Sequence, residues 1–287
     1  MRKHWLLLIM ILVLFLLLCW SLWWSNCGLR AVRYSVGGKT LPAGFDGFRI
    51  VQLSDLHSVS FGKDNERLLR MIREEKPDIL VMTGDMVSRH DESFDVTLAL
   101  CRTLAEEYPV YYIRGNHEEG LETAIWESYR ASLENIGVRV LDNETIRLTA
   151  GNGDSINLTG LWYRLDYYHQ YASHYRPVTA ETMYTILGDA PAGYNVLLAH
   201  NPNYFPVYAA WGADVTFCGH IHGGMIRLPF LGGLLSPETI LFPKYDGGEY
   251  HLEDKTMILS RGLGRGRMGI RLFNPPELVT VTLTREE

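Results

Sequence analysis

A continuous apolar run opens the chain. Residues 5–24 read WLLLIMILVLFLLLCWSLWW and carry no charged side chain, and about 20 apolar residues are the length that an α-helix needs to cross the hydrocarbon core of a bilayer. The apolar region of a cleaved signal peptide is shorter and ends at small residues, whereas Trp20, Trp23 and Trp24 stand at the end of this run. Because tryptophans are common at membrane interfaces, residues 1–28 are predicted to form a retained membrane anchor with one transmembrane helix.

Positive charges stand on both sides of this run. Arg2 and Lys3 precede it, and Arg30, Arg33 and Lys39 follow it. Loops rich in Lys and Arg stay on the cytoplasmic side, but the count does not decide between the two orientations. The charges directly before the run favour a cytoplasmic N-terminus. The prediction is therefore a single-pass membrane protein whose folded domain is extracytoplasmic.

Strands and helices alternate in the next part of the chain. A stretch with several glycines and a proline, residues 29–47, is expected to be a juxtamembrane linker. The elements predicted after it are strands at 48–54, 78–85 and 110–117 and helices at 65–75, 94–107 and 121–135. This alternation is typical of βαβ units in an α/β fold.

The second half of the domain, which is predicted to extend over residues 48–287, is richer in strands. These are expected at 145–148, 155–160, 195–199, 215–218, 225–228, 257–260 and 278–283. A Tyr-rich segment, residues 161–194, fits neither periodicity and is interpreted as an insertion or flap. Its aromatic side chains could be ordinary core or could line an acyl or nucleobase pocket, and both interpretations stay open for Trp162, Tyr163, Tyr167, Tyr168, Tyr171 and Tyr175.

Composition and charge narrow the class of protein. A chain of 287 residues, 47% of them hydrophobic, is long enough for one large folded domain besides the anchor. The formal net charge of -6 gives no overall positive field that would attract nucleic acid, so no nucleic-acid partner is expected. Cys101 and Cys218 show no CxxC spacing and are expected to be buried thiols rather than zinc ligands or a disulfide.

Five polar clusters built from Asp, Asn and His interrupt the apolar pattern, and four of them directly follow a predicted strand. They are Asp55-Leu56-His57, Gly84-Asp85, Gly115-Asn116-His117, His200-Asn201 and Gly219-His220-Ile221-His222. Their glycines are expected to let the backbone turn sharply at the strand ends. A single Asp or His after a strand is commonly a turn residue, but five such clusters, four of them at the strand ends where α/β proteins bind ligands, predict a functional site.

The residue types in these clusters indicate a metal site. Carboxylates and imidazoles suit manganese, iron or zinc. Because alternate residues of a strand project to the same side, Asp55 and His57, and likewise His220 and His222, are expected to present their side chains together. One carboxylate can bridge two ions about 3.5–4 Å apart, and two such ions hold the attacking and leaving oxygens of an in-line displacement.

The motifs DLH, GD, GNH, AHNP and GHIHGG, in that order, resemble the signature of the calcineurin-like metallophosphoesterases. The segments FCGHIHGG, LFPKYDGGEY, SRGLG and RLFNPPEL are similar to a bacterial subgroup of membrane-associated phosphoesterases, which includes enzymes proposed to cleave UDP-2,3-diacylglucosamine. The resemblance covers residues 48–283 and implies a four-layer α/β/β/α sandwich of two mixed β-sheets. It also implies two-metal hydrolysis of a phosphodiester or pyrophosphate bond in a lipid-linked or nucleotide-lipid substrate.

The same resemblance implies a role for each motif residue. Two divalent metal ions, with manganese preferred over iron and zinc, would be held by Asp55, His57 and His222 on one side and by Asn116, His200 and His220 on the other, with Asp85 bridging. His117 would be the catalytic histidine that contacts the phosphoryl group or protonates the leaving oxygen.

Two departures from the family pattern lie beside the motifs. Glu118 stands where relatives often have Asp, and because this residue usually lies behind the ligands, the cost is expected to be modest. After residues 155–160, relatives commonly have an acidic turn where this chain has Leu-Trp-Tyr-Arg, which leaves the substrate open. Candidates for binding an anionic substrate group are Arg114, Arg261 and Arg265.

Two other functions stay open at this point. The chain could be a tethered phosphomonoesterase or cyclic phosphodiesterase with a soluble substrate, or a non-catalytic scaffold that keeps the fold and binds metal. The complete set of ligand motifs and the presence of His117 favour an enzyme. The sequence does not decide the metal, the physiological substrate or the oligomeric state.

Overall fold

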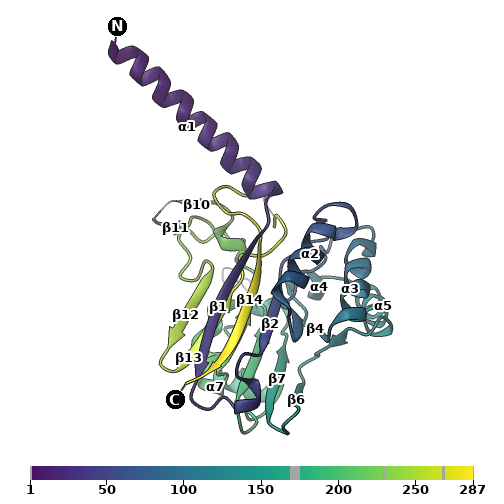
Figure 1. Cartoon of the computed structure of the whole chain (residues 1–287). Helices are drawn as coiled ribbons and strands as arrows, with labels where there is room; N and C mark the ends of the chain where they lie inside the picture. Colours follow the sequence, from purple (N-terminus) through teal and green to yellow (C-terminus); the bar gives the residue numbers. More distant parts are fainter. Residues whose placement is uncertain (1, 169–174, 229, 267–268, 287) are drawn as a thin grey trace.

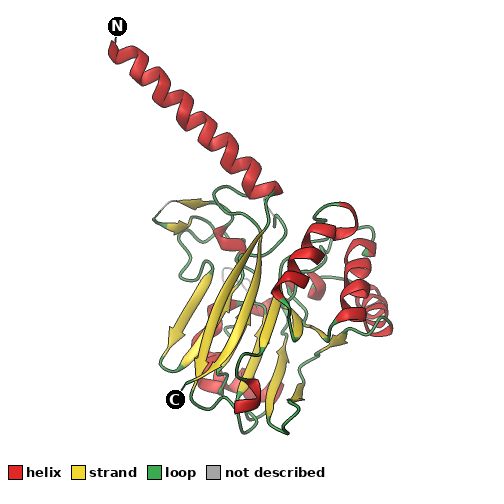
Figure 2. Cartoon of the chain, viewed as in Figure 1, coloured by secondary structure: helices red, strands yellow, loops and turns green. Residues whose placement is uncertain are grey.

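The computed structural model describes residues 2–168, 175–228, 230–266 and 269–286. Within these residues the chain forms a long helix, α1 (Arg2–Cys27), that projects from a body built from two six-stranded sheets (Figure 1). Helices lie on the outer sides of the sheets (Figure 2).

The first sheet belongs mainly to the N-terminal half of the body. Over the described residues its strand order is β1 (Arg30–Gly38), β14 (Glu277–Arg285), β2 (Arg49–Leu53), β3 (Ile79–Met82), β4 (Val110–Tyr112) and β5 (Arg139–Val140). β2 to β5 run parallel, whereas β14 is antiparallel to β2. The helices between these strands are α2 (Glu66–Glu75), α3 (Asp95–Glu107) and α5 (Thr123–Asn135). Leu68 and Ile72 of α2 share an apolar cluster with Val51 and Leu80 of the sheet, so the helices cover its outer face.

The second sheet contains the strands of the C-terminal half. In the described part of the chain its order is β12 (Gly248–Leu252), β13 (Lys255–Leu259), β9 (Val215–Cys218), β8 (Asn195–Ala199), β7 (Ser155–Leu161) and β6 (Thr145–Thr149). The helices α6 (Ala180–Leu187) and α7 (Phe205–Trp211) cover its outer face. Met183 and Tyr208 of these helices pack in one apolar cluster with Leu197 and Met257 of the sheet.

The inner faces of the two sheets pack against each other. Ile50 and Val81 of the first sheet share a fully buried cluster with Phe217 of the second. Successive residues of a strand point to opposite faces, so the neighbouring Val51 and Leu80 face the helices instead. The predicted four-layer α/β/β/α sandwich of two mixed sheets is confirmed.

The segment expected to be a juxtamembrane linker, residues 29–47, contains a strand. β1 pairs in parallel with β14 along nine residues, from Arg30 opposite Glu277 to Gly38 opposite Arg285. Its sequence, RAVRYSVGG, has one fully buried side chain, Val36, and ends in two glycines, so its apolar periodicity is weak. An edge strand of this kind depends on its partner strand, and the folded body therefore begins close to Arg30.

Among the other predicted elements, those with the longest apolar periodicity agree best with the structure. The helices predicted at 65–75, 94–107 and 121–135 correspond to α2, α3 and α5. The strands predicted at 78–85 and 110–117 end earlier, at Met82 and Tyr112, because the motif residues that follow have left the sheet. Cys101 and Cys218 are buried free thiols, as expected.

α1 is the helix in the described residues that is long and apolar enough to cross a membrane. From Leu6 to Leu18 its large apolar side chains are 41% to 67% exposed. A soluble protein rarely leaves an apolar surface of this extent in water. The observation fits the predicted anchor, although length and composition alone do not establish a span.

The C-terminal end of α1 is attached to the body by polar contacts. Four hydrogen bonds form this attachment. The Asn26 side chain donates to the carbonyl of Arg271 and accepts from the N–H of the same residue. The N–H groups of Phe273 and Asn274 donate to the hydroxyls of Ser21 and Ser25. Ser21 and Ser25 are buried by these contacts. The last two turns of α1 therefore belong structurally to the folded body.

A pair of N-terminal deletions tests this attachment. Deleting residues 1–20 is expected to leave the body's stability unchanged, whereas deleting residues 1–26 also removes these four hydrogen bonds and should cost about 4 kcal/mol, at about 1 kcal/mol each. Urea denaturation of both truncated proteins in the same detergent measures the difference. Equal free energies of unfolding would show that the end of α1 does not support the body.

Candidate metal centre

The predicted ligands lie in the loops that follow five strands. Asp55 and His57 follow β2, Asp85 follows β3, Asn116 follows β4, His200 follows β8, and His220 and His222 follow β9. Because β2, β3 and β4 are parallel, as are β8 and β9, the carboxyl ends within each sheet share one edge. The structure brings the Asp and His side chains of this set together in two adjoining groups, and a third group joins His57 and Asp85 to His117.

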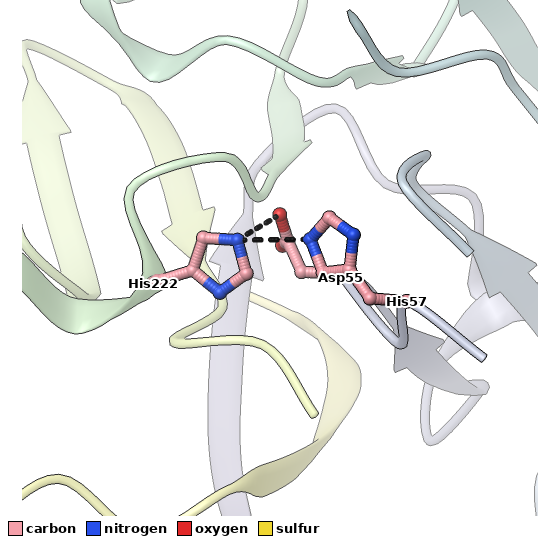
Figure 3. A group of neighbouring side chains, drawn as sticks. All are labelled: Asp55, His57 and His222. Atoms are coloured by element: carbon pink, nitrogen blue, oxygen red, sulfur yellow. Dashed lines mark hydrogen bonds and ion pairs between the residues drawn. The ribbon is translucent and has the colours of Figure 1, made fainter. Parts of the chain in front are cut away.

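The first group contains Asp55, His57 and His222 (Figure 3). His57 Nε2 is 3.1 Å from His222 Nε2, and His222 Nε2 is 3.4 Å from Asp55 Oδ1. The fully buried Asp55 carboxylate is held in place by the Ser54 hydroxyl and the His220 N–H, which both donate to it. Two imidazole nitrogens and a carboxylate oxygen that face one another form a donor set for a divalent cation.

The second group contains Asp85, His200 and His220. His200 Nε2 lies 3.3 Å from Asp85 Oδ2, and the same oxygen lies 4.0 Å from His57 Nε2, so the Asp85 carboxylate stands between the two groups. His200 Nδ1 is 2.6 Å from the carbonyl oxygen of Thr83 and donates to it. In the neutral ring that binds a metal, the Nε2 lone pair would therefore point to Asp85, which is the orientation that a metal-binding histidine usually has.

The electrostatics of the site fit bound cations. Among the described residues, the buried atoms His200 Nε2 and Asn116 Oδ1 have no hydrogen-bond partner, and such an atom costs about 1–3 kcal/mol unless something binds it. Burial alone would lower the pKa of His200, but Asp85 and Asp55 raise it to about 9, so positive charge is favoured here. Burial lowers the pKa of His57 to about 4, which keeps that imidazole in the neutral form that binds metals.

The ligand loops adopt an uncommon backbone conformation. Asp55, His57, Asp85, His220 and His222 all have positive φ, between 47° and 75°. Only a few per cent of non-glycine residues do so, and these conformations cluster at functional sites. The expectation that the paired ligands meet as alternate residues of a strand is wrong, because β2 and β9 end before them. The side chains converge because left-handed residues turn the loops.

Glycine is needed beside the ligands for two different reasons. Gly84 has a φ of 88°, so its backbone makes the sharp turn that the sequence predicted. Gly115 and Gly219 instead permit close approach, because a Cβ on Gly115 would collide with Asp85 and a Cβ on Gly219 would collide with Ser54. A larger residue at either position would push a ligand loop out of place.

Glu118 organises the loop that contains Asp85. Its carboxylate accepts hydrogen bonds from the N–H groups of Asp85, Met86, Val87 and Gly115 and from the hydroxyl of Tyr112. Burial and the nearby Asp85 raise the pKa of Glu118 to about 7. The backbone N–H donors aimed at both of its oxygens stabilise the ionised form, in which such hydrogen bonds are strong. Glu118 therefore positions the backbone of Asp85, and its role is larger than the modest one expected from the sequence.

Glu118→Gln is expected to destabilise the body by about 3 kcal/mol, because the amide NH₂ would face N–H groups that the carboxylate now accepts. Urea denaturation of the full-length protein in detergent measures the loss. Glu119→Gln is the matched control, since Glu119 is the last residue of α4 (Asn116–Glu119), the short helix that contains Glu118, and pairs with Arg114. Its replacement should cost less than about 1 kcal/mol. Similar losses for the two variants would contradict the positioning role.

His117 is oriented by the backbone. Its Nδ1 accepts a hydrogen bond from Arg89 N–H at 3.2 Å, so the proton of the neutral ring is on Nε2. The backbone N–H of His117 donates to Asp85 Oδ1, and its ring lies edge-on to that of His57 with 4.6 Å between the ring centres. Burial lowers the pKa of His117, which favours the neutral ring. His117 therefore has an N–H available to donate.

A cavity of about 650 Å³ opens beside the two groups. Six motif residues line it, and so do Arg89, Glu238 and Arg265. Glu238 Oε1 lies 3.1 Å from His220 Nε2. Nothing in the sequence around Glu238 distinguishes it from an ordinary loop residue, so sequence reasoning missed it. The only indication in the sequence that Arg89 would line the cavity is its position shortly after the Gly84-Asp85 motif.

Of the three arginines expected to bind an anionic group, Arg265 lines this cavity. Arg114 lies outside it and pairs with Asp142 at 2.9 Å. Arg261 is directed at Glu277, which also accepts its backbone N–H. The charges of Arg114 and Arg261 thus face carboxylates outside this cavity, and Arg265 is the one of the three that lines it.

Part of the Tyr-rich segment packs as core, whereas Trp162 lies over the guanidinium of Arg114 and belongs to no core cluster. Tyr163 and Tyr168 are buried in the apolar cluster on the outer face of the second sheet, together with Tyr208. The ring of Tyr168 lies 5.3 Å from that of His220 and supports the second ligand group from behind. The candidate pocket residue Tyr171 lies outside the described residues.

A two-sheet sandwich with adjoining Asp and His groups at its strand ends is the arrangement expected of a metallophosphoesterase. The sequence profile of the family described as calcineurin-like phosphoesterase matches residues 48–224. The chain belongs to this family, which uses a dinuclear metal centre, and the predictions of the family and of a metal-dependent phosphoesterase are confirmed.

Several relatives are similar over most of their length. An uncharacterized metallophosphoesterase of Bacillus subtilis, YkuE, is 28% identical over 261 residues, covering 89% of this chain and 85% of the relative. The UDP-2,3-diacylglucosamine pyrophosphatase LpxG of Chlamydia muridarum is 27% identical, covering 81% of this chain and 82% of the relative. The phosphodiesterase YaeI of Escherichia coli is 27% identical and covers 82% of each. These identities are too low to transfer a substrate.

Proposed function

We propose that this chain uses two divalent metal ions to hydrolyse a phosphodiester or pyrophosphate bond in a lipid-linked or nucleotide-lipid substrate at a membrane surface. The observation that supports the proposal most directly is the Asp85 carboxylate, which stands between two buried groups of Asp and His side chains. The donors are oxygen and nitrogen atoms, which suit manganese and also iron or zinc.

The proposed metal ligands are assigned to each ion from the way their side chains are grouped. One ion would be held by Asp55, His57 and His222, and the other by Asn116, His200 and His220, with Asp85 shared between them. When bound, the ions supply Lewis acidity and lower the pKa of the attacking water. The protein's own contribution is to fix these donors in a buried site before substrate arrives.

Groups of the cavity wall act on the substrate itself. His117 donates its Nε2–H to a phosphoryl oxygen and stabilises the negative charge that develops there, because Arg89 N–H holds the ring in this tautomer. Arg265 adds a positive charge at the mouth of the same cavity. Glu118 keeps the Asp85 loop in its uncommon conformation.

The membrane location rests on α1 and on the relatives. α1 crosses the bilayer once and places the phosphoesterase domain outside the cytoplasm, next to the lipid surface. Its exposed apolar length supports a span. The relatives named UDP-2,3-diacylglucosamine pyrophosphatase support a nucleotide-linked lipid as the substrate class.

Metal analysis and substrate comparison test this proposal. The full chain, purified in detergent, should contain about two transition-metal ions per chain. It should turn over a lipid pyrophosphate in mixed micelles faster than bis(p-nitrophenyl) phosphate. Less than one bound ion per chain would contradict the enzymatic function. Faster turnover of the small diester would contradict the lipid substrate and leave the two-metal site in place.

A further inference from the structure

Three loop segments near the base of α1 expose large apolar side chains. Phe230 and Leu231 lie in the turn between β10 (Arg227–Leu228) and β11 (Gly232–Gly233). The other exposed side chains are Leu241 and Phe242 in the next hairpin and Ile270 and Phe273 in the segment before β14. These six residues, called the apolar rim below, are each at least 40% exposed, and Phe230 is fully exposed. Isolated apolar residues on a surface are common, but a group of this size marks an interaction site.

The three segments lie side by side. Ile226 forms a bridge with Leu272, and Phe242 N–H donates to the carbonyl of Leu234, which follows β11. Figure 1 shows β10 and β11 at the end of the body from which α1 emerges. The contact between Phe273 and Ser21 attaches the rim directly to α1.

This contact also fixes the depth of the rim relative to α1. Ser21 is inside the apolar run, three residues before Trp24, and a helix rises about 1.5 Å per residue, so Phe273 lies roughly 4–5 Å deeper along α1 than Trp24. Tryptophans of a membrane helix stand at the interface between hydrocarbon and head groups. If α1 spans the bilayer up to its tryptophans, Phe273 cannot remain in bulk water.

We infer that the apolar rim enters the interfacial layer of the bilayer leaflet from which α1 emerges. This inference rests on the proposed membrane span of α1. The occupant is lipid rather than another protein, because the rim is continuous with α1 and lies at the depth of its tryptophans. Burial of exposed Phe and Leu side chains at the acyl boundary is favourable and strengthens binding to the bilayer surface.

The position of the rim has a consequence for the active site. Pro237 and Glu238, which precede Leu241, line the cavity, and so do Arg265 and Gly266, which precede Ile270. The cavity wall and the rim therefore belong to the same loops. A lipid substrate could reach the metal centre from the bilayer surface while its acyl chains stay in the membrane.

Depth-dependent fluorescence quenching in phosphatidylcholine vesicles tests the inference. The full chain with Cys19→Ser and Cys27→Ser keeps only the buried thiols Cys101 and Cys218. In this background, Leu231→Cys is labelled with a polarity-sensitive fluorophore, and lipids with spin labels on the acyl chains serve as quenchers. The matched control is Leu252→Cys, which is 40% exposed at the end of β12 that points away from α1 (Figure 1). Quenching at position 231 should be several-fold stronger than at position 252.

A third labelled protein separates the rim from the anchor. Native Cys19, labelled in a Cys27→Ser chain, reports whether α1 itself lies in the bilayer. Strong quenching at Cys19 with equal, weak quenching at positions 231 and 252 would overturn the inference and leave the anchor standing. Weak quenching at Cys19 as well would overturn both. None of these measurements depends on hydrolysis, so they stand apart from the test of enzymatic function.

Activity provides a second measurement. Combined replacement of Phe230, Leu231 and Phe242 by Ser should leave turnover of a small diester in detergent unchanged and lower turnover of a lipid pyrophosphate in vesicles several-fold. Leu252→Ser should change neither rate. An equal loss on both substrates would assign the rim to folding, and no loss on the vesicle substrate would show that the rim does not serve substrate access.

Discussion

Asp85→Asn should remove both metal ions and lower turnover about 10³-fold, because the ions are expected to share this one carboxylate. Asp85 faces His57 of the first group and His200 and His220 of the second, whereas Asp55 is grouped with His57 and His222 alone, although its Oδ1 also lies 3.9 Å from His200 Nε2. An amide offers a neutral oxygen in place of a bridging carboxylate. Asp55→Asn should instead weaken one ion and spare the other, and metal analysis after dialysis at low metal concentration distinguishes the two results.

The Asp85→Asn variant is suited to this test because the amide has the same shape as the carboxylate. The Asn side-chain oxygen can still accept the hydrogen bond that His117 N–H now donates to Asp85 Oδ1, so the fold should persist. Asp189→Asn, at an exposed residue, is the control for the substitution itself. Two ions bound with unchanged affinity in Asp85→Asn would show that this carboxylate does not bridge.

The sequence was sufficient to predict those parts of the candidate site that depend on where the strands end. Apolar strands followed by Asp, Asn and His predicted that the candidate side chains gather at strand ends, and the Asp and His residues do so because parallel strands bring their carboxyl ends to one edge of a sheet. The order of the motifs then indicated the family, and with it the two-sheet sandwich. The roles of the individual ligands stay predictions until metal binding is measured.

Other features depend on contacts between distant segments and have no local signal. β1 forms because Arg30 and its neighbours find β14 at the other end of the chain. Glu238 reaches His220 only through the folding of its loop. Arg114 resembled a phosphate clamp in the sequence, but its pairing with Asp142 was decided by tertiary structure. Local periodicity cannot report such pairings, because they are set by which surfaces meet.

His117→Ala should keep both metal ions and lower turnover about 10²–10³-fold, the loss typical of removing one donor to a developing negative charge. The hydrogen bond from His117 to Asp85 is donated by the backbone N–H, which the alanine variant retains. A ring nitrogen of His117 also faces Asp85 and His57, so metal analysis of the variant is part of this test. His90→Ala is the matched control, because His90 lines the same cavity and is exposed. His117→Gln, whose amide can donate but cannot ionise, should recover part of the lost rate.

The dependence of this loss on the leaving group separates two roles of His117. A general acid that protonates the leaving oxygen would matter most for alkyl esters and least for nitrophenyl esters. The Arg89 N–H can only donate, so the hydrogen bond to His117 Nδ1 requires a neutral ring with its proton on Nε2. A neutral imidazole is a poor acid but a good hydrogen-bond donor. We therefore expect a similar loss for all esters, and a loss that grows as the leaving group becomes more basic would establish the acid role instead.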